Sequence, residues 1–210
     1  TNGTIVQVIV NHPPTNLYDN ALANDFHNFT MAIQNAPTPP KVVVVSSSLA
    51  GYWIYYLDIH VLSNAHPPPP PANASEVSEI FHEDVAAIMV MPTIWIAAIN
   101  GRTFGAGNEL ALAMDMRFAG PKALLGTIEA ALGITHANDG IQYLVALLGR
   151  ARALEVLLSA GDADAKRAEA IGWVNTAYDS AAELKSAVGL LAHRISLFPE
   201  QALNATKTGV

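Results

Sequence analysis

The chain contains no cysteine among its 210 residues, which excludes disulfide bonds, thiolate metal sites and thiol catalysis. Positive charge is also scarce: the chain has 11 Lys and Arg but 18 Asp and Glu, so its formal net charge is -7. It contains no run of basic residues that would suit the binding of nucleic acid. The longest apolar stretch, Val85 to Ile99, is broken by Pro92 and is shorter than the roughly 20 residues that a membrane-spanning helix needs. We therefore expect neither a nucleic-acid partner nor a membrane partner.

Apolar residues, by contrast, are plentiful. They make up 51% of the chain, charged residues make up 14%, and the mean hydropathy is +0.26. These values favour one compact α/β domain over residues 1–210 with a large core. The first residues carry neither a basic signal region nor an Arg-rich presequence. We expect a soluble protein, in the cytoplasm or in an organelle such as the mitochondrion or peroxisome, and the compartment stays open.

Hydrophobic periodicity predicts strands that alternate with helices. Short apolar runs between turn residues indicate strands buried on both faces, and apolar residues three and four apart indicate helices. This alternation implies parallel strands joined by right-handed crossovers, and therefore an α/β fold. The expected strands are 4–10, 41–45, 94–99 and 116–119, and the expected helices are 21–34, 75–89, 109–113, 141–148, 150–159, 165–171 and 180–197.

The segment 66–75 is rich in proline, with five prolines in succession from Pro67 to Pro71. Such a run adopts a stiff, extended conformation, so it predicts a surface loop. A proline-rich ligand for a partner domain is the alternative interpretation.

The stretch 100–115 is the most informative part of the chain. An apolar strand ends at the turn pair 100–101, and the Gly-Ala-Gly loop 105–107 opens directly into helix-forming residues. Small residues at such a junction let a ligand approach the backbone, and the first N–H groups of a helix have no internal partner. A developing oxyanion could be held there, with Glu109 facing the same pocket. The alternative is an ordinary tight packing turn between a strand and a helix.

Several separated motifs resemble, in the right order, those of the enoyl-CoA hydratase/isomerase (crotonase) superfamily. The resemblance covers nearly the whole chain and is densest from Pro92 to Asn175. It implies a crotonase-like (ClpP/crotonase) spiral of ββα repeats that binds an acyl-CoA thioester. Coenzyme A would then be part of the substrate, with no covalently bound cofactor and no metal. The motifs are Ile96-Ala97-Ala98-Ile99-Asn100-Gly101, Gly105-Ala106-Gly107-Asn108-Glu109-Leu110-Ala111-Leu112-Ala113-Met114-Asp115, Gly126-Thr127-Ile128-Glu129 with Leu132-Gly133-Ile134, 148–155 and 168–175.

The resemblance also implies an oxyanion hole made of two backbone N–H groups. By alignment these belong to Ala106 and to Leu57, which lies in the segment 53–59 where the family usually reads Phe-Ser-Ala-Gly-Ala-Asp-Leu. Glu109 and Glu129 match the two carboxylates of the hydratases. Glu109 would hold the attacking water, and Glu129 would serve as acid and base at the α-carbon. The structural alternatives are a first-turn residue that complements the helix dipole for Glu109 and a solvated loop carboxylate for Glu129.

By the same resemblance, the loops before and after the first oxyanion donor would line the path of the substrate and of coenzyme A. The family usually assembles as homotrimers or dimers of trimers, so we expect such an assembly here. The residues assigned to this path are Asn16, Leu17, Tyr55, Tyr56, Asp58 and Gly105.

Two departures from the family pattern lie close to the expected site. Tyr55 and Tyr56 replace small residues before Leu57, and two phenol rings would narrow or re-route the path of coenzyme A. Further along, the family's Pro-Gly-Ala-Gly-Gly is replaced by His-Ala-Asn-Asp-Gly at 136–140. Asp139 is similar in position to the nucleophile region of 4-chlorobenzoyl-CoA dehalogenase, or it caps a helix. His136 is a candidate proton shuttle, or it makes a structural polar contact.

A third departure is that the chain ends at Val210. Members of the family usually continue with helices that close the pocket and form the trimer, so we expect the C-terminal helical region to be largely absent.

Three functions stay open at this stage. The first is hydration of a 2-enoyl-CoA by a lyase of fatty acid metabolism. The second is an isomerase, or a hydrolase or dehalogenase-type enzyme that uses Asp139. The third is a non-catalytic binding protein with the same fold. Because a pure double-bond isomerase needs only the second carboxylate, the presence of both Glu109 and Glu129 favours the hydratase.

Overall fold

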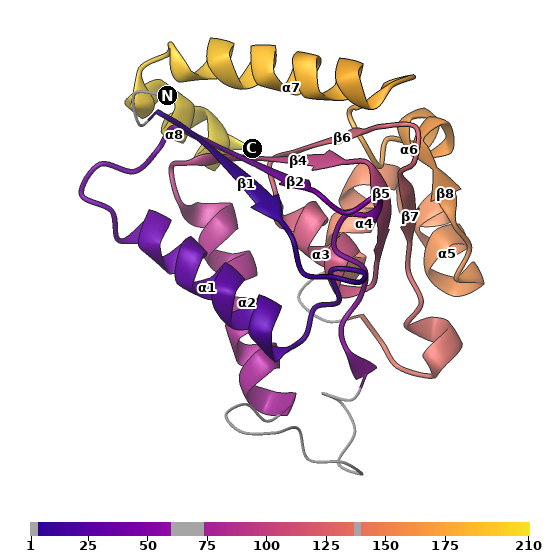
Figure 1. Cartoon of the computed structure of the whole chain (residues 1–210). Helices are drawn as coiled ribbons and strands as arrows, with labels where there is room; N and C mark the ends of the chain where they lie inside the picture. The colour runs from indigo at the N-terminus through magenta and orange to yellow at the C-terminus, as the bar shows by residue number, and fades with distance from the viewer. Residues whose placement is uncertain (1–3, 60–73, 137–139) are drawn as a thin grey trace.

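The computed structural model describes residues 4–59, 74–136 and 140–210, which form two β-sheets with helices packed around them (Figure 1). The first sheet has the order β1-β2-β4-β6-β9, and all its pairs are parallel. The second has the order β3-β5-β7-β8, in which only the β7–β8 pair is antiparallel. The strands are β1 (Ile5–Val10), β2 (Val42–Ser47), β3 (Gly51–Tyr52), β4 (Ile94–Ile99), β5 (Gly101–Phe104), β6 (Met116–Ala119), β7 (Leu124–Gly126), β8 (Ala163–Asp164) and β9 (Thr176–Ala177).

The same unit recurs three times along the chain. A strand of the first sheet is followed at once by a strand of the second sheet and then by a helix, as in β2-β3-α2, β4-β5-α3 and β6-β7-α4. The turn between β4 and β5 is tight because Gly101 lies against β3: an added Cβ would sit 2.4 Å from the backbone nitrogen of Tyr52. The expected α/β fold with parallel strands is therefore confirmed.

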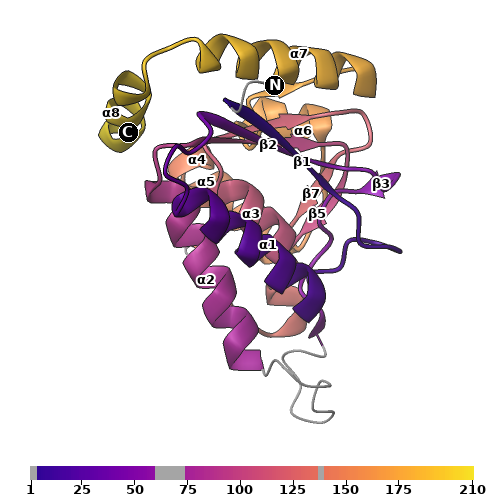
Figure 2. The same ribbon diagram turned by 60° about the vertical axis from the view of Figure 1, so that its left-hand side comes forward.

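Helices cover both faces of the first sheet. α1, α2 and α3 pack on one face and α7 on the other, as two views show (Figures 1 and 2). In β2, Val43 and Val45 point into the first of these cores, whereas Val42 and Val44 point towards α7. The helices are α1 (Asn20–Gln34), α2 (Ala74–Val90), α3 (Ala106–Ala113), the 3-10 helix η2 (Ala130–Leu132), α4 (Gly140–Leu148), α5 (Arg150–Ser159), α6 (Ala165–Ile171), α7 (Ala181–Ser196) and α8 (Glu200–Gly209).

The expected long strands and helices are all present, but several elements differ from the predictions. α3 begins at Ala106, three residues earlier than expected, and α8 follows Pro199, where no helix was predicted. The last two residues of the predicted loop 66–75 belong to α2, and the rest of that loop lies outside the described residues. The strands β3, β5, β7, β8 and β9, with two to four residues each, were not predicted, because they are too short for a periodic pattern. No helix in the described ranges has both the length and the apolar character needed to cross a membrane.

A buried guanidinium holds the C-terminal end of α3. Arg117 on β6 donates through Nη1 to the carbonyls of Met114 (2.8 Å), Ala111 (3.3 Å) and Leu112 (3.4 Å), and through Nε to Trp173 (3.1 Å). A cation at this end complements the helix dipole and satisfies carbonyls that have no partner within the helix. Burial lowers the pKa of Arg117 to about 10. The group therefore stays charged at neutral pH and fixes α3 against the sheet.

Replacing this side chain should destabilise the protein. We expect Arg117→Met to lower the free energy of unfolding by about 3 kcal/mol, because several buried carbonyls lose their donor. Urea denaturation followed by circular dichroism measures the change. Arg152→Met, at an exposed position on α5, is the matched control and should change stability by less than about 0.5 kcal/mol. Equal effects of the two substitutions would contradict the assigned role.

A buried acid joins α1 to α2. The Asp84 side chain is fully buried, and its Oδ1 lies 2.9 Å from Nδ1 of His27. Burial raises the pKa of Asp84 to about 7, although the contact with His27 opposes the shift. Since the folded state holds this proton more tightly than the unfolded chain does, its contribution to stability declines as the pH rises from about 4 to about 7.

The substitution Asp84→Asn removes this titration. We expect the stability of Asp84→Asn relative to the parent to increase by on the order of 2 kcal/mol between pH 5 and pH 8. Unfolding at a series of pH values measures the difference, and Asp25→Asn, an exposed position on α1, serves as control. A difference that stays constant over this range would show that Asp84 does not titrate in this way.

Candidate active site

The N-terminus of α3 lies against the loop 53–58. Gly105, the residue before the helix, has φ 51° and ψ -123°, a conformation that favours glycine. Gly107 makes a closer contact: an added Cβ would sit 2.0 Å from the carbonyl oxygen of Ile54. The loop is also bonded to β5, since the N–H of Phe104 donates to the carbonyl of Tyr55 at 2.8 Å. The backbone of the loop and the first turn of the helix are therefore in direct contact.

The two backbone N–H groups expected to form the oxyanion hole belong to a half-buried residue, Leu57, and a buried one, Ala106. Tyr18 forms an isolated parallel bridge with Leu57, accepting from the N–H of Asp58 (3.1 Å) and donating to the carbonyl of Tyr56 (2.9 Å). In this pattern the N–H of Leu57 points away from Tyr18. Within the described ranges, neither this N–H nor that of Ala106, the first residue of α3, donates a hydrogen bond. Their expected role as an oxyanion hole stays a prediction.

Asn16 holds the loop from behind. Its side chain is fully buried and donates to the carbonyl of Trp53 (2.6 Å) and to the hydroxyl of Ser47 (2.8 Å). Its own carbonyl accepts from the N–H of Tyr55 at 3.0 Å. The residue was expected to contact the substrate or coenzyme A, but its polar side-chain atoms are already bonded within the protein. Asn16 therefore supports the loop, and its half-buried neighbour Leu17 lies in the same turn.

Glu129 lies beside the N-terminus of α3. Its Oε1 would be 3.1 Å from a Cβ at Gly105, and its Oε2 accepts from the N–H of Ile128 at 2.8 Å. The imidazole Nε2 of His136 lies 2.9 Å from the same Oε2, and only 5% of the His136 side chain is exposed. Burial raises the pKa of Glu129, but the contact with His136 and the backbone hydrogen bonds outweigh it, so the pKa is lower than usual. The carboxylate is therefore ionised at neutral pH.

Glu109 occupies the first turn of α3 and is 4% exposed. Its carboxylate faces the beginning of α4, where an added Cβ at Gly140 would sit 2.8 Å from Oε1. The family pattern has glycines in this region. A side chain at position 140 would occupy the space of the Glu109 carboxylate and push that carboxylate out of its place. The carboxylate of Glu129 thus lies beside Gly105, the residue that precedes α3. Glu109 lies four residues further along the chain, in the first turn of that helix.

The two tyrosines belong to a half-buried aromatic cluster. The ring centroid of Tyr55 lies 4.2 Å from that of Tyr56, 5.2 Å from that of Tyr52 and 5.7 Å from that of Phe104. Burial and the neighbouring phenols raise the pKa of Tyr55, so its hydroxyl stays neutral. Tyr56 also approaches Gly105, with its Cβ 3.6 Å from an added Cβ there. The cluster therefore borders the same helix terminus.

Sequence reasoning assigned no role to two supports of the site. Arg117 at the far end of α3 was missed, although a lone arginine in an otherwise apolar strand was a usable signal. The bond from Trp173 Nε1 to Asn108 Oδ1 (3.0 Å), which holds the first turn of α3, left no signal of its own. Asp139 lies outside the described residues, so its expected role stays a prediction. The described part of the chain contains no cluster of His, Asp or Glu suited to a metal ion.

Comparison with known proteins identifies the family of the chain. The model of the enoyl-CoA hydratase/isomerase family matches residues 1–209. The 2,3-dehydroadipyl-CoA hydratase of Escherichia coli K12 is 32% identical over 148 residues, 65% of this chain and 58% of that protein. The mitochondrial methylglutaconyl-CoA hydratase of Rattus norvegicus is 30% identical over 64% of this chain and 42% of its own length. The chain spans about half the length of the curated relatives it matches.

Solved structures show the same fold. Pseudomonas aeruginosa DspI is 28% identical, with a TM-score of 0.87 over 98% of this chain and 82% of its own. The enoyl-CoA hydratase of Bacillus anthracis, 24% identical, has a TM-score of 0.86 over 98% of this chain and 78% of its own, which concerns the fold alone. The expected crotonase-like fold is confirmed, and with a family match over nearly all of its residues the chain belongs to the enoyl-CoA hydratase/isomerase family.

Proposed function

We propose that the protein hydrates a 2-enoyl-CoA. The observation that carries the proposal is the placement of two buried carboxylates beside the N-terminus of α3, where the N–H of Ala106 has no acceptor in the described part of the chain. Relatives named as hydratases of CoA thioesters support the substrate class. In the proposed complex, the thioester oxygen accepts hydrogen bonds from the N–H groups of Ala106 and Leu57.

The proposed reaction uses each carboxylate once. Ionised Glu109 takes a proton from water as the water oxygen bonds to the β-carbon, and the electrons of the double bond move to the thioester oxygen. Two preorganised donors stabilise that enolate, and each is worth roughly 3 kcal/mol. Glu129, which is ionised at neutral pH, first takes up a proton from solvent and then delivers it to the α-carbon, while Glu109 releases to solvent the proton that it took from water. In the reverse dehydration, ionised Glu129 removes the α-proton and protonated Glu109 assists departure of the hydroxyl group.

The contact between His136 and Glu129 supports a second candidate, isomerisation of a 3-enoyl-CoA to the 2-enoyl isomer. A lower pKa keeps Glu129 ionised, and the ionised carboxylate is the base that removes an α-proton. The same enolate forms, and a proton returns at the γ-carbon. This reaction needs the two backbone donors and Glu129, but it does not need Glu109.

Substitution of each carboxylate distinguishes the two reactions. Glu129→Gln should slow both hydration of crotonyl-CoA and isomerisation of a 3-enoyl-CoA by about 10²- to 10⁴-fold. Glu109→Gln should slow hydration by a similar factor and leave isomerisation nearly unchanged. Loss of enone absorbance measures hydration, and its gain measures isomerisation.

The surface variant Glu155→Gln is the control, because this glutamate is 61% exposed on α5 and pairs with Arg167. Its rates should equal those of the parent. A folded Glu129→Gln protein that hydrates crotonyl-CoA as fast as the parent would refute the role of that residue. Binding of acyl-CoA without turnover of any enoyl thioester would favour a non-catalytic member of the family.

The role of His136 is tested by the pH dependence of the rate. Replacing His136 with glutamine removes an imidazole contact that lowers the pKa of Glu129, so this pKa should rise relative to that of the parent. We expect the acid limb of kcat/KM for isomerisation, or for dehydration of a 3-hydroxyacyl-CoA, to move to higher pH. His193→Gln, at an exposed position on α7, should leave the profile in place. An unshifted acid limb in His136→Gln would show that the imidazole does not set the ionisation of Glu129.

A further inference from the structure

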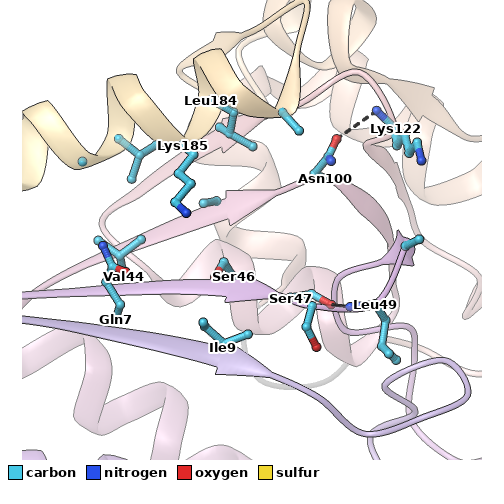
Figure 3. Close-up of a pocket in the computed structure, with 16 residues that line it drawn as sticks. Gln7, Ile9, Val44, Ser46, Ser47, Leu49, Asn100, Lys122, Leu184 and Lys185 are labelled. Atoms are coloured by element: carbon cyan, nitrogen blue, oxygen red, sulfur yellow. Dashed lines mark hydrogen bonds between the residues drawn. The ribbon is translucent and has the colours of Figure 1, made fainter.

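A cavity of about 430 Å³ lies between α7 and the first sheet, on the face opposite to α3 (Figure 3). Its volume falls in the range of small-molecule sites. It is lined by the ends of β1 and β2, by the turns after β4 and β6, and by the first half of α7. None of the residues assigned to the candidate active site lines it, so it is a separate feature of the fold.

Two lysines without a salt bridge in the described part of the chain line this cavity. Lys185 extends from α7 towards Ser46, and Lys122 lies at the other end beside Asn100 (Figure 3). No carboxylate or imidazole belongs to the lining. The chain has three other lysines, and each has a partner: Lys41 donates to the carbonyls of Ser196 and Phe198, Lys166 lies 3.5 Å from Asp179, and Lys207 lies 3.0 Å from Asp115. In a chain of net charge -7, the two lysines without a salt bridge in the described ranges thus both belong to the rim of one cavity, where their side chains are exposed.

The remaining lining divides into an apolar base and polar groups. Val44, Ala98, Leu184 and Val188 are buried side chains between the sheet and α7, and they form the base. Hydroxyl and amide groups come from 46–48, Gln7 and Asn100. An apolar base suits a hydrocarbon body, and the lysine ammonium groups suit an anionic head. The hydroxyls of Ser46 and Ser48 already donate to the carbonyls of Val8 and Val10.

We propose that this cavity binds a small carboxylate with an apolar body, a medium-chain fatty acid in chemical class. The carboxylate would lie at Lys185 or Lys122, and the hydrocarbon chain would cover the base of the cavity. A lone inorganic anion would interact only with the lysines, and a neutral alcohol would contact only the apolar base of the cavity. The proposed ligand needs both.

Calorimetric titration with octanoate tests the proposal. We expect one molecule to bind per chain, with acetate and octanol each binding at least tenfold more weakly. Lys185→Gln and Lys122→Gln should each weaken octanoate binding by about fivefold to tenfold, and the double variant should abolish it. Lys166→Gln, which removes a lysine outside the cavity, is the matched control and should bind as the parent does.

A second variant fills the cavity instead of changing its charge. Gly189 lines it from α7, and an added Cβ there meets nothing within 4 Å, so Gly189→Leu should fold normally and block octanoate. Titrations are repeated with octanoyl-CoA, a saturated thioester that occupies the active site if the proposed function is correct. Octanoate binding should not change, and it should not depend on whether octanoyl-CoA itself binds.

Any of four results would overturn the proposal. These are no binding of octanoate, equal binding of octanol, unchanged affinity in the double lysine variant, and displacement of octanoate by octanoyl-CoA. The last result would place the octanoate in the active site.

Discussion

The close contact between α3 and the loop 53–58 is the constraint on which the candidate site depends. Gly107 has no room for a side chain because the carbonyl of Ile54 occupies that space. The proposed oxyanion hole requires this approach, because in it the first N–H of α3 and the N–H of Leu57 would serve the same ligand atom. The surrounding structure holds both partners: Asn16 and Tyr18 fix the loop, while Arg117 and Trp173 fix the helix. Main-chain geometry is thus set by buried side chains that need not touch the substrate.

The two acids have different surroundings, and this difference matters for the chemistry. Glu129 contacts an imidazole and a backbone N–H, both of which stabilise its ionised form. Glu109 instead faces a glycine at the start of α4, with protein close on that side. An acid kept ionised is suited to removing a proton, whereas hydration needs the same acid to deliver one. Under the proposed function, the balance between hydration and isomerisation would therefore depend on His136, which stands where the family usually has proline.

The sheet separates two environments of different character. On the side of α3 lie the carboxylates and the aromatic cluster of Tyr55 and Tyr56. On the side of α7 lies a cavity with two lysines and no acid. Strands such as β2 make this possible, because alternate residues point to opposite faces and each face is covered by helices. One apolar strand thus contributes to both cores.

How much the sequence determined depends on the range of each interaction. Apolar runs predicted β1, β2, β4 and β6, because such signals are local. The 105–107 loop and the family resemblance together predicted the site residues. The strands of the second sheet and β9 were not predicted from such a signal. Each has only two to four residues, and it forms only by pairing with a strand that is distant in the sequence. The support given by Asn16, the contact of His136 with Glu129 and the cavity beside α7 all depend on contacts that no local pattern encodes. Their distances and burial, and hence their protonation states, were decided only when the chain had folded.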